Sequence, residues 1–211
     1  MSIQTSAVGI LHDKFVFGRR ARILSDWFAE FAPRGCRILD VGCGDGLISA
    51  LLQSKRPDLS IQGIDVLARE NTHIPVSKFD GTHIPFQDRF FDVVLFSDVL
   101  HHTEDPRILM REACRVADHV LIKDHYREGL AAYSRLRFMD WIGNARFGVA
   151  LPYNYWTKAQ WREAWRLMGL RTEQMSSQLG LYFPPVNWIF GAQLHFIALL
   201  GKNSLDSISR S

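Results

Sequence analysis

Short apolar runs alternate along the chain with amphipathic segments of helical length. Four runs, at residues 37–41, 61–65, 91–97 and 119–124, are apolar along most of their length, as strands are when both faces of a parallel sheet are covered. Residues 76–80 form a weaker fifth run. This alternation predicts a doubly wound α/β fold, in which helices cover both faces of a mostly parallel sheet.

Helical periodicity fills the intervals between these runs. The predicted helices cover residues 21–31, 47–52, 105–116 and 157–169. Pro33 and Gly35 end the first of them, and Pro106 suits the first turn of the third. Thr157 and Gln160 have the spacing of a capping box, which predicts a helix start at Thr157.

The last third of the chain has a different pattern. Residues 127–156 are rich in arginine and aromatic residues and lose their helical period after Trp141, so we expect a helix and an irregular cap over the sheet edge. Candidate strands at 171–177 and 195–201 are predicted to pair antiparallel and to finish the sheet. We therefore predict one domain over residues 1–211, with a seven-stranded sheet, an antiparallel last strand and a possible substrate cap.

A glycine-rich turn joins the first predicted strand to the helix that follows it. The turn runs from Asp40 to Gly46 and reads DVGCGDG. Glycine lets the backbone turn tightly and approach a ligand closely, and the helix N-terminus beyond it offers N–H groups to an anion. Asp65 ends the next strand, about 20 residues on, where nucleotide-binding folds hold a ribose diol.

Two ligands compete for such a turn, a dinucleotide such as NAD and S-adenosylmethionine. The glycines are spaced GxGxG rather than GxGxxG, and Asp40 and Asp45 flank the turn. Their carboxylates would repel a pyrophosphate, whereas S-adenosylmethionine has no phosphate and brings an ammonium and a sulfonium. Its carboxylate still suits the helix N-terminus. Electrostatics therefore favours S-adenosylmethionine, with an NAD-dependent oxidoreductase as the alternative.

The chain resembles the class I S-adenosylmethionine-dependent methyltransferases, within the small-molecule, methyltransferase type 11-like branch. The resemblance begins with ILDVGCGDG (38–46) and continues through GID (63–65), FDGTHIPFQDRFFDVV (79–94) and SDVLHHTEDP (97–106). The fold that it implies is the Rossmann-like methyltransferase fold, and the cofactor is S-adenosyl-L-methionine. The signatures Asn-Pro-Pro-Tyr, Asp-Pro-Pro-Tyr and Pro-Cys of DNA methyltransferases are absent from the sequence, which favours a small-molecule acceptor.

The resemblance also assigns roles to individual residues. It places Asp65 at the ribose hydroxyls, Asp80 with Gly81 at the adenine, and Ser97 with His102 beside the methionine moiety. The expected cofactor-binding set is Asp40, Gly42, Cys43, Gly44, Asp65, Val66, Asp80, Gly81 and Ser97.

Histidines supply the catalytic candidates. Methyl transfer from a sulfonium is a direct displacement, so much of its rate comes from alignment, but a hydroxyl acceptor would also need a base of near-neutral pKa. His102 and His125 follow candidate strands four and five and are the expected catalytic residues, each with a structural role as the alternative. We expect His101 to flank a helix at the surface, and Asp124 to pair there with Lys123 or Arg127.

Aromatic and uncharged segments suggest where the acceptor lies. Tyr153, Tyr155 and Trp156 could form the wall of an acceptor pocket, or belong to a packed cap. The uncharged segment 179–193 could shield an apolar acceptor or form an oligomer contact. A membrane span over 174–201 is not expected, because prolines and polar side chains interrupt that stretch.

Composition narrows the remaining choices. The formal charge is only +3, without basic runs, which argues against nucleic acid as a partner. Three cysteines form neither a CxxC pair nor a disulfide framework, so no thiol metal site is expected. The N-terminus lacks the apolar core of a signal peptide, so a cytoplasmic location is predicted.

Together these observations predict an S-adenosylmethionine-dependent methyltransferase that acts on a small, largely apolar acceptor by in-line transfer and needs no metal. Two alternatives stay open: an NAD-dependent oxidoreductase, and a regulatory protein that binds S-adenosylmethionine without chemistry. The sequence leaves the acceptor and the oligomeric state undetermined.

Overall fold

A computed structural model describes residues 18–67, 69–129, 131–144, 152–183 and 194–203. The helices are α2 (Gly18–Phe31), α3 (Leu47–Lys55), α4 (Pro106–Val116), α5 (Ala132–Asn144) and α6 (Lys158–Leu167), with a 3-10 turn, η2 (Leu100–His102). The strands are β1 (Arg37–Val41), β2 (Ser60–Asp65), β3 (Val76–Lys78), β4 (Phe91–Ser97), β5 (Ala117–His125), β6 (Leu170–Ser176) and β7 (His195–Lys202). These bounds agree with the predicted elements to within a few residues.

The seven strands form one sheet in the order β3-β2-β1-β4-β5-β7-β6. Strands β1 to β5 are parallel to one another, and β7 is antiparallel to both of its neighbours, β5 and β6. The predicted antiparallel finish of the sheet is confirmed. Because β1, β2, β4 and β5 run in the same direction, the residues that follow them gather at one edge of the sheet, where open α/β sheets bind their ligands.

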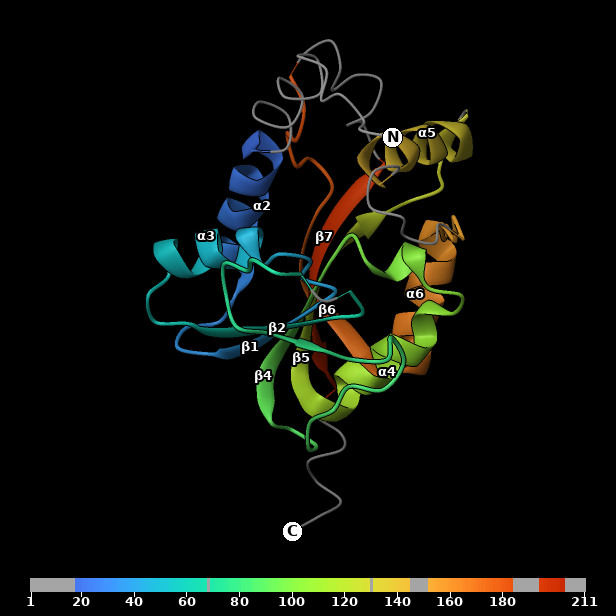
Figure 1. The fold of residues 1–211 in the computed structure, drawn as a ribbon. Coiled ribbons are helices and arrows are strands. Elements are labelled where there is room, and N and C mark those ends of the chain that lie inside the picture. The colour runs from blue at the N-terminus through green and yellow to red at the C-terminus, as the bar shows by residue number, and fades with distance from the viewer. Residues whose placement is uncertain (1–17, 68, 130, 145–151, 184–193, 204–211) are drawn as a thin grey trace.

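Helices cover both faces of the sheet, as predicted. Helices α2 and α3 lie on one side and α4 and α6 on the other (Figure 1). Each side has its own apolar core: Leu24 and Phe28 of α2 join one, and Met110 of α4 and Trp161 of α6 join the other. Alternate side chains of the buried strands feed the two cores, which explains why those strands are apolar throughout.

The capping box predicted at Thr157 is present. The Thr157 hydroxyl accepts a hydrogen bond from the Gln160 backbone N–H, and the Gln160 side chain accepts one from the Thr157 backbone N–H. The helix that it starts, α6, carries Trp161 and Trp165 into the core, so the sequence pattern fixed both the start of the helix and its buried face.

Part of the predicted cap is visible near the carboxyl edge of the sheet. Helix α5 stands there, and residues 152–156 lead into α6 (Figure 1). Leu179 and Leu181, at the start of the uncharged segment, are buried in the core on the α2 side. Most of that segment, residues 184–193, lies outside the described residues. None of the described helices is long and apolar enough to cross a membrane.

Candidate functional site

The glycine turn after β1 has the backbone that its sequence predicted. Gly42, Gly44 and Gly46 all have positive φ, at 74°, 63° and 77°. A Cβ added to Gly42 would lie 2.6 Å from a methyl carbon of Val99, the residue before η2. Glycine is therefore required there both by the left-handed backbone and by the close approach of the segment after β4.

Asp65 ties this turn to the end of β2. One carboxylate oxygen accepts a hydrogen bond from the Gly44 N–H at 2.8 Å, and the other accepts one from the Leu67 N–H at 2.8 Å. The side chain lies at the turn, as expected of a ribose-binding residue, and the residue is buried, with 8% of its surface exposed. Each bonded oxygen keeps a second lone pair that a ligand hydroxyl could use.

Asp40 is buried beneath the same turn with half of its carboxyl group unsatisfied. Its Oδ2 accepts a 2.6 Å hydrogen bond from the Ser49 hydroxyl, while Oδ1 is buried and accepts none from the residues that the structure describes. Burial raises the pKa of Asp40 to about 7, against the hydrogen bond of Ser49, which lowers it. A buried, unpaired carboxyl oxygen at this place suits a cationic ligand group.

Other expected cofactor residues lie around this centre. A Cβ on Gly81 would meet the Val66 side chain at 3.1 Å, so these two positions are neighbours. Asp80 is exposed, and hydrogen bonds from the His83 and Thr82 N–H groups hold its pKa below the usual range. Ser97 ends β4, and its buried hydroxyl makes no hydrogen bond within the described part of the chain.

Two further side chains, those of Cys43 and Arg69, lie at or over the turn. Burial raises the pKa of the Cys43 thiol, which disfavours the thiolate form that a nucleophile needs. The Arg69 guanidinium lies 3.3 Å from where a Cβ on Gly44 would be, so it crosses the turn. No pattern in the sequence indicated that Arg69 lies over the turn, because Arg69 follows β2 in an irregular segment.

A buried cluster of charged and imidazole side chains forms at the ends of β4 and β5. Asp98, directly after β4, forms ion pairs with Lys123 of β5 and Arg20 of α2. Lys123 is completely buried, and Asp98 adopts a positive φ of 60°, a strained backbone for a residue other than glycine. Burial alone would raise the pKa of Asp98, but the charges of Arg20 and Lys123 hold it well below its usual range.

His101 and Asp124 form a close contact between an imidazole and a carboxylate in this cluster. His101 Nδ1 lies 2.7 Å from Asp124 Oδ1, and the two side chains are 1% and 0% exposed. The Leu100 and His125 N–H groups donate to the same carboxylate at 3.2 and 2.8 Å. Although burial opposes it, His101 keeps the pKa of Asp124 low, by its charge when the imidazole is protonated and by its hydrogen bond, so Asp124 is ionised.

This arrangement corrects two predictions. His101 was expected at the surface and is instead buried in the 3-10 turn, and Asp124 was expected to pair at the surface with Lys123 or Arg127 but is buried against His101. Surface pairing is the usual fate of an aspartate beside a lysine. Here β5 carries Lys123 and Asp124 deep into the sheet, and no local pattern in the sequence showed that both would be buried.

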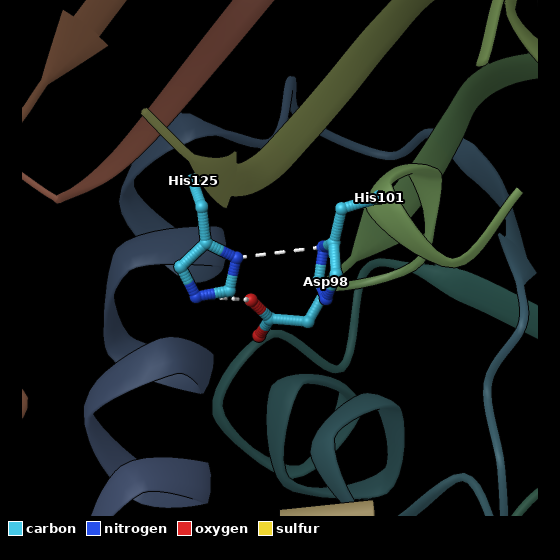
Figure 2. Close-up of side chains that lie close together, drawn as sticks. All are labelled: Asp98, His101 and His125. Atoms are coloured by element: carbon cyan, nitrogen blue, oxygen red, sulfur yellow. Dashed lines mark hydrogen bonds and ion pairs between the residues drawn. The ribbon is translucent and has the colours of Figure 1, made fainter. Parts of the chain in front are cut away.

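His125 and His102, the expected catalytic residues, lie beside this pair. His125 Nδ1 is 3.4 Å from His101 Nδ1, and its Nε2 is 3.6 Å from Asp98 Oδ1 (Figure 2). Burial and the nearby Lys123 charge hold the pKa of His125 well below 6.5, so the ring is neutral near pH 7. The centroid of the His102 ring lies 4.0 Å from that of the His101 ring.

Asp98, His101 and His125 also have the composition of a metal site. One ligand-type atom from each lies within 4.8 Å of the others. However, Lys123 and Arg20 already contact both carboxylate oxygens of Asp98, and Lys123 is too deeply buried to move aside easily. A divalent ion would meet two resident cations, so ion pairing by side chains is the better account of this cluster.

A cavity of 610 Å³ opens next to the cluster, between the cap and the segment after η2. Its lining residues are Glu104, Arg127, Tyr133, Pro152, Tyr153 and Asn154. Asn154 fixes the cap there, because its N–H donates to the His101 carbonyl at 3.1 Å. Tyr153 lines the cavity as expected, whereas Tyr155 is buried with its ring 5.5 Å from that of His101, and Trp156 packs on Trp161.

Comparison with known protein families shows which family this chain belongs to. A family model described as a methyltransferase domain matches residues 14–175, which is most of the chain. The chain belongs to the methyltransferase domain family. This confirms the resemblance drawn from the sequence motifs and identifies S-adenosylmethionine as the cofactor. It decides between the two ligands that the glycine turn left open, against NAD.

Curated relatives of this methyltransferase match over shorter stretches. The chain is 29% identical over 108 residues to 27-O-demethylrifamycin SV methyltransferase of Amycolatopsis mediterranei, covering 44% of this chain and 39% of that protein. It is 32% identical over 105 residues to ubiquinone biosynthesis O-methyltransferase of Psychrobacter arcticus, covering 41% and 38%. The methyltransferase thus spans about two fifths of the length of these relatives.

Solved structures match the methyltransferase over nearly its whole length. The methyltransferase in the complex with the Haloferax volcanii Trm112 activator has a TM-score of 0.65 at 16% identity, covering 90% of this chain and 93% of that one. A SAM-dependent methyltransferase from Aquifex aeolicus has a TM-score of 0.59 at 17% identity, covering 89% and 95%. The [4+2]-cyclase SpnF has a TM-score of 0.60 at 18% identity, covering 86% and 81%. These likenesses confirm the Rossmann-like methyltransferase fold.

Proposed function

We propose that this methyltransferase is an enzyme that transfers a methyl group from S-adenosylmethionine to a small, largely apolar molecule by in-line displacement. The observation that carries the proposal is the meeting of two features at one edge of the sheet. The glycine turn with Asp65 lies at the ends of β1 and β2, and the 610 Å³ cavity lies near the ends of β4 and β5. That volume is in the range of small-molecule pockets.

The residues at the turn fit the proposed cofactor. Asp65 would hold the ribose, the unpaired Oδ1 of Asp40 would face the ammonium group, and Val66 with Gly81 and Asp80 would border the adenine. Gly42, Cys43 and Gly44 would lie along the methionine end, with Ser97 opposite them. When bound, S-adenosylmethionine supplies a methyl group that is already activated for transfer.

The chain contributes alignment and exclusion of water. Buried walls around His101, His125 and Tyr155 keep the acceptor side of the site dry, which strengthens every charge interaction there. The tyrosine rings that line the cavity offer apolar surface to the acceptor. Arg127 and Glu104 add polar groups at its exposed rim. His102 and His125 lie against His101 at the ends of β4 and β5, and we retain them as proposed catalytic residues.

The raised pKa of Asp40 makes cofactor affinity depend on pH. The group is largely protonated below pH 7 in the free protein, and pairing with an ammonium requires its ionised form. We therefore expect the affinity for S-adenosylmethionine to rise with pH, by at most about tenfold per pH unit below 7, and to level off above it. Isothermal titration in buffers of different ionisation enthalpy should show proton release on binding below pH 7.

The control for this linkage is Asp40→Asn, which keeps the shape of the side chain and cannot ionise. We expect weaker binding with no dependence on pH over the same range. A wild-type affinity that is constant from pH 5.5 to 8, or a variant that keeps the pH dependence, would show that Asp40 does not face the cofactor.

Methyl transfer itself is tested with a labelled methyl group. Protein incubated with methyl-labelled S-adenosylmethionine and a panel of phenols, quinols, amines and carboxylic acids should transfer label to one class of small molecule. Tight cofactor binding without transfer to any acceptor would instead favour a regulatory protein. We propose a cytoplasmic location, because the three cysteines form no disulfide framework, and no nucleic-acid partner, because the formal charge is only +3 without basic runs.

A further inference from the structure

His101, which was predicted from the sequence to lie at the surface, has the geometry of a proton acceptor. Asp124 is ionised and can only accept hydrogen bonds, so the 2.7 Å contact requires the proton to be on His101 Nδ1. In the neutral ring, Nε2 then carries the lone pair. A buried carboxylate that orients an imidazole and stabilises its protonated form is the arrangement of a general base.

The pair is held rigidly from several elements. Two backbone N–H groups, of Leu100 and His125, fix the Asp124 carboxylate, and the Asn154 N–H fixes the His101 carbonyl. His101 is two residues from Val99, whose side chain packs over Gly42 of the glycine turn. The same short segment therefore connects the methionine end of the proposed cofactor site to the pair.

The charges around the pair leave it able to gain a proton. Lys123 and Arg20 are both paired with Asp98, and burial keeps His125 neutral near pH 7. Asp124, in direct contact with His101, and Asp98, whose charge also acts on His101, are the carboxylates that balance an imidazolium there. His195 of β7, the third histidine of the cluster, contacts Lys123 at 3.3 Å.

We propose that His101, oriented by Asp124, removes the proton from a hydroxyl acceptor, so that this chain is an O-methyltransferase. The inference rests on the proposed function. The hydroxyl oxygen forms a bond to the methyl carbon as the carbon–sulfur bond breaks, sulfur keeps that electron pair, and the hydroxyl proton moves to His101 Nε2. Solvent later takes this proton. His101 is 1% exposed and its ring stacks on that of Tyr155, so the proposed transfer requires Tyr155 to move before an acceptor in the cavity can reach His101.

The first test needs no acceptor. Nitrogen-15 NMR of the histidine rings, assigned by comparison with His101→Asn, should show His101 protonated at Nδ1 and bare at Nε2 at pH 7.5. Asp124→Asn should abolish this preference. A proton on Nε2 of wild-type His101 at that pH would overturn the proposal, because the nitrogen could not then act as a base.

The second test separates a base from a structural residue. His101→Asn keeps an N–H that can donate to Asp124 but has no basic nitrogen. For weakly acidic phenols and alcohols we expect kcat to fall by about 10²- to 10⁴-fold. For 4-nitrophenol, which is largely ionised in mildly alkaline buffer, the loss should be far smaller. The same substitution at His119, which pairs with Glu173 at the opposite end of β5, should leave both activities unchanged.

Each other outcome has a defined meaning. Equal losses with all phenols, transfer to amines or carbon acids alone, or no transfer to any hydroxyl acceptor by protein that binds S-adenosylmethionine would overturn the proposal. So would activity that is lost with a chelator and restored by a divalent ion, which would assign Asp98, His101 and His125 to a metal. Absence of S-adenosylmethionine binding by titration would contradict the proposed function instead, while the NMR result would still report on His101.

Discussion

Gly44→Arg is expected to abolish binding of S-adenosylmethionine while the protein still folds. Gly44 has a φ of 63°, and its N–H is held by Asp65, so any side chain there projects from the centre of the turn beside Arg69. A long cationic side chain would fill the space of the methionine end and repel the sulfonium. Isothermal titration should detect no binding at concentrations at which the wild-type protein saturates.

Gly35→Arg is the matched control for this substitution. Gly35 has nearly the same backbone, with a φ of 64°, but a Cβ there would meet nothing within 4 Å. Both variants should lose about 1–2 kcal/mol of stability from the left-handed backbone. Only Gly44→Arg should lose the cofactor, and unchanged affinity in that variant would remove the turn from the site.

Lys123→Met should destabilise the fold by about 3–5 kcal/mol, because removal of one partner leaves a buried charge uncompensated. Lys123 is fully buried and contacts Asp98, which in the variant keeps the partly exposed Arg20 and the longer contact to His125. Urea unfolding followed by circular dichroism measures the loss. The double variant Asp98→Asn/Lys123→Met should recover much of it, since no unpaired carboxylate is then buried.

The control for this prediction is a second lysine in an ion pair. Lys202 pairs with Asp118 at 3.1 Å, but the two side chains are 27% and 56% exposed. Lys202→Met should therefore cost less than about 1 kcal/mol. Similar losses at both lysines would mean that the Asp98 cluster contributes no more than a surface pair.

The fold could be predicted from the sequence because the patterns that determine it are local. Apolar runs bounded by helices of period 3.6 predict buried parallel strands, and β1, β2, β4 and β5 lie where those runs placed them. The glycine turn was equally readable, since positive φ at Gly42, Gly44 and Gly46 leaves glycine as the usual choice. The capping box at Thr157 needed only four residues to be recognised.

The acceptor side of the site could not be predicted from the sequence, because it depends on how deeply each side chain is buried in the sheet. Lys123, Asp124 and His125 are the last residues of β5, and charged residues at such a place are usually exposed, yet all three are buried. Their burial arises from β7 on one side and from η2 on the other, and both contacts join residues far apart in the sequence. His101 therefore looked like a surface residue, although strand pairing and the short turn after β4 carry it inside.

The most direct test of this account is a crystal structure of the protein with S-adenosylhomocysteine, the product that methyl transfer leaves. We expect its ribose hydroxyls on Asp65, its ammonium near Asp40 and its sulfur on the side of the turn that faces His101 and the 610 Å³ cavity. A nucleoside bound away from the ends of β1 and β2, or a sulfur that faces away from His101, would contradict it.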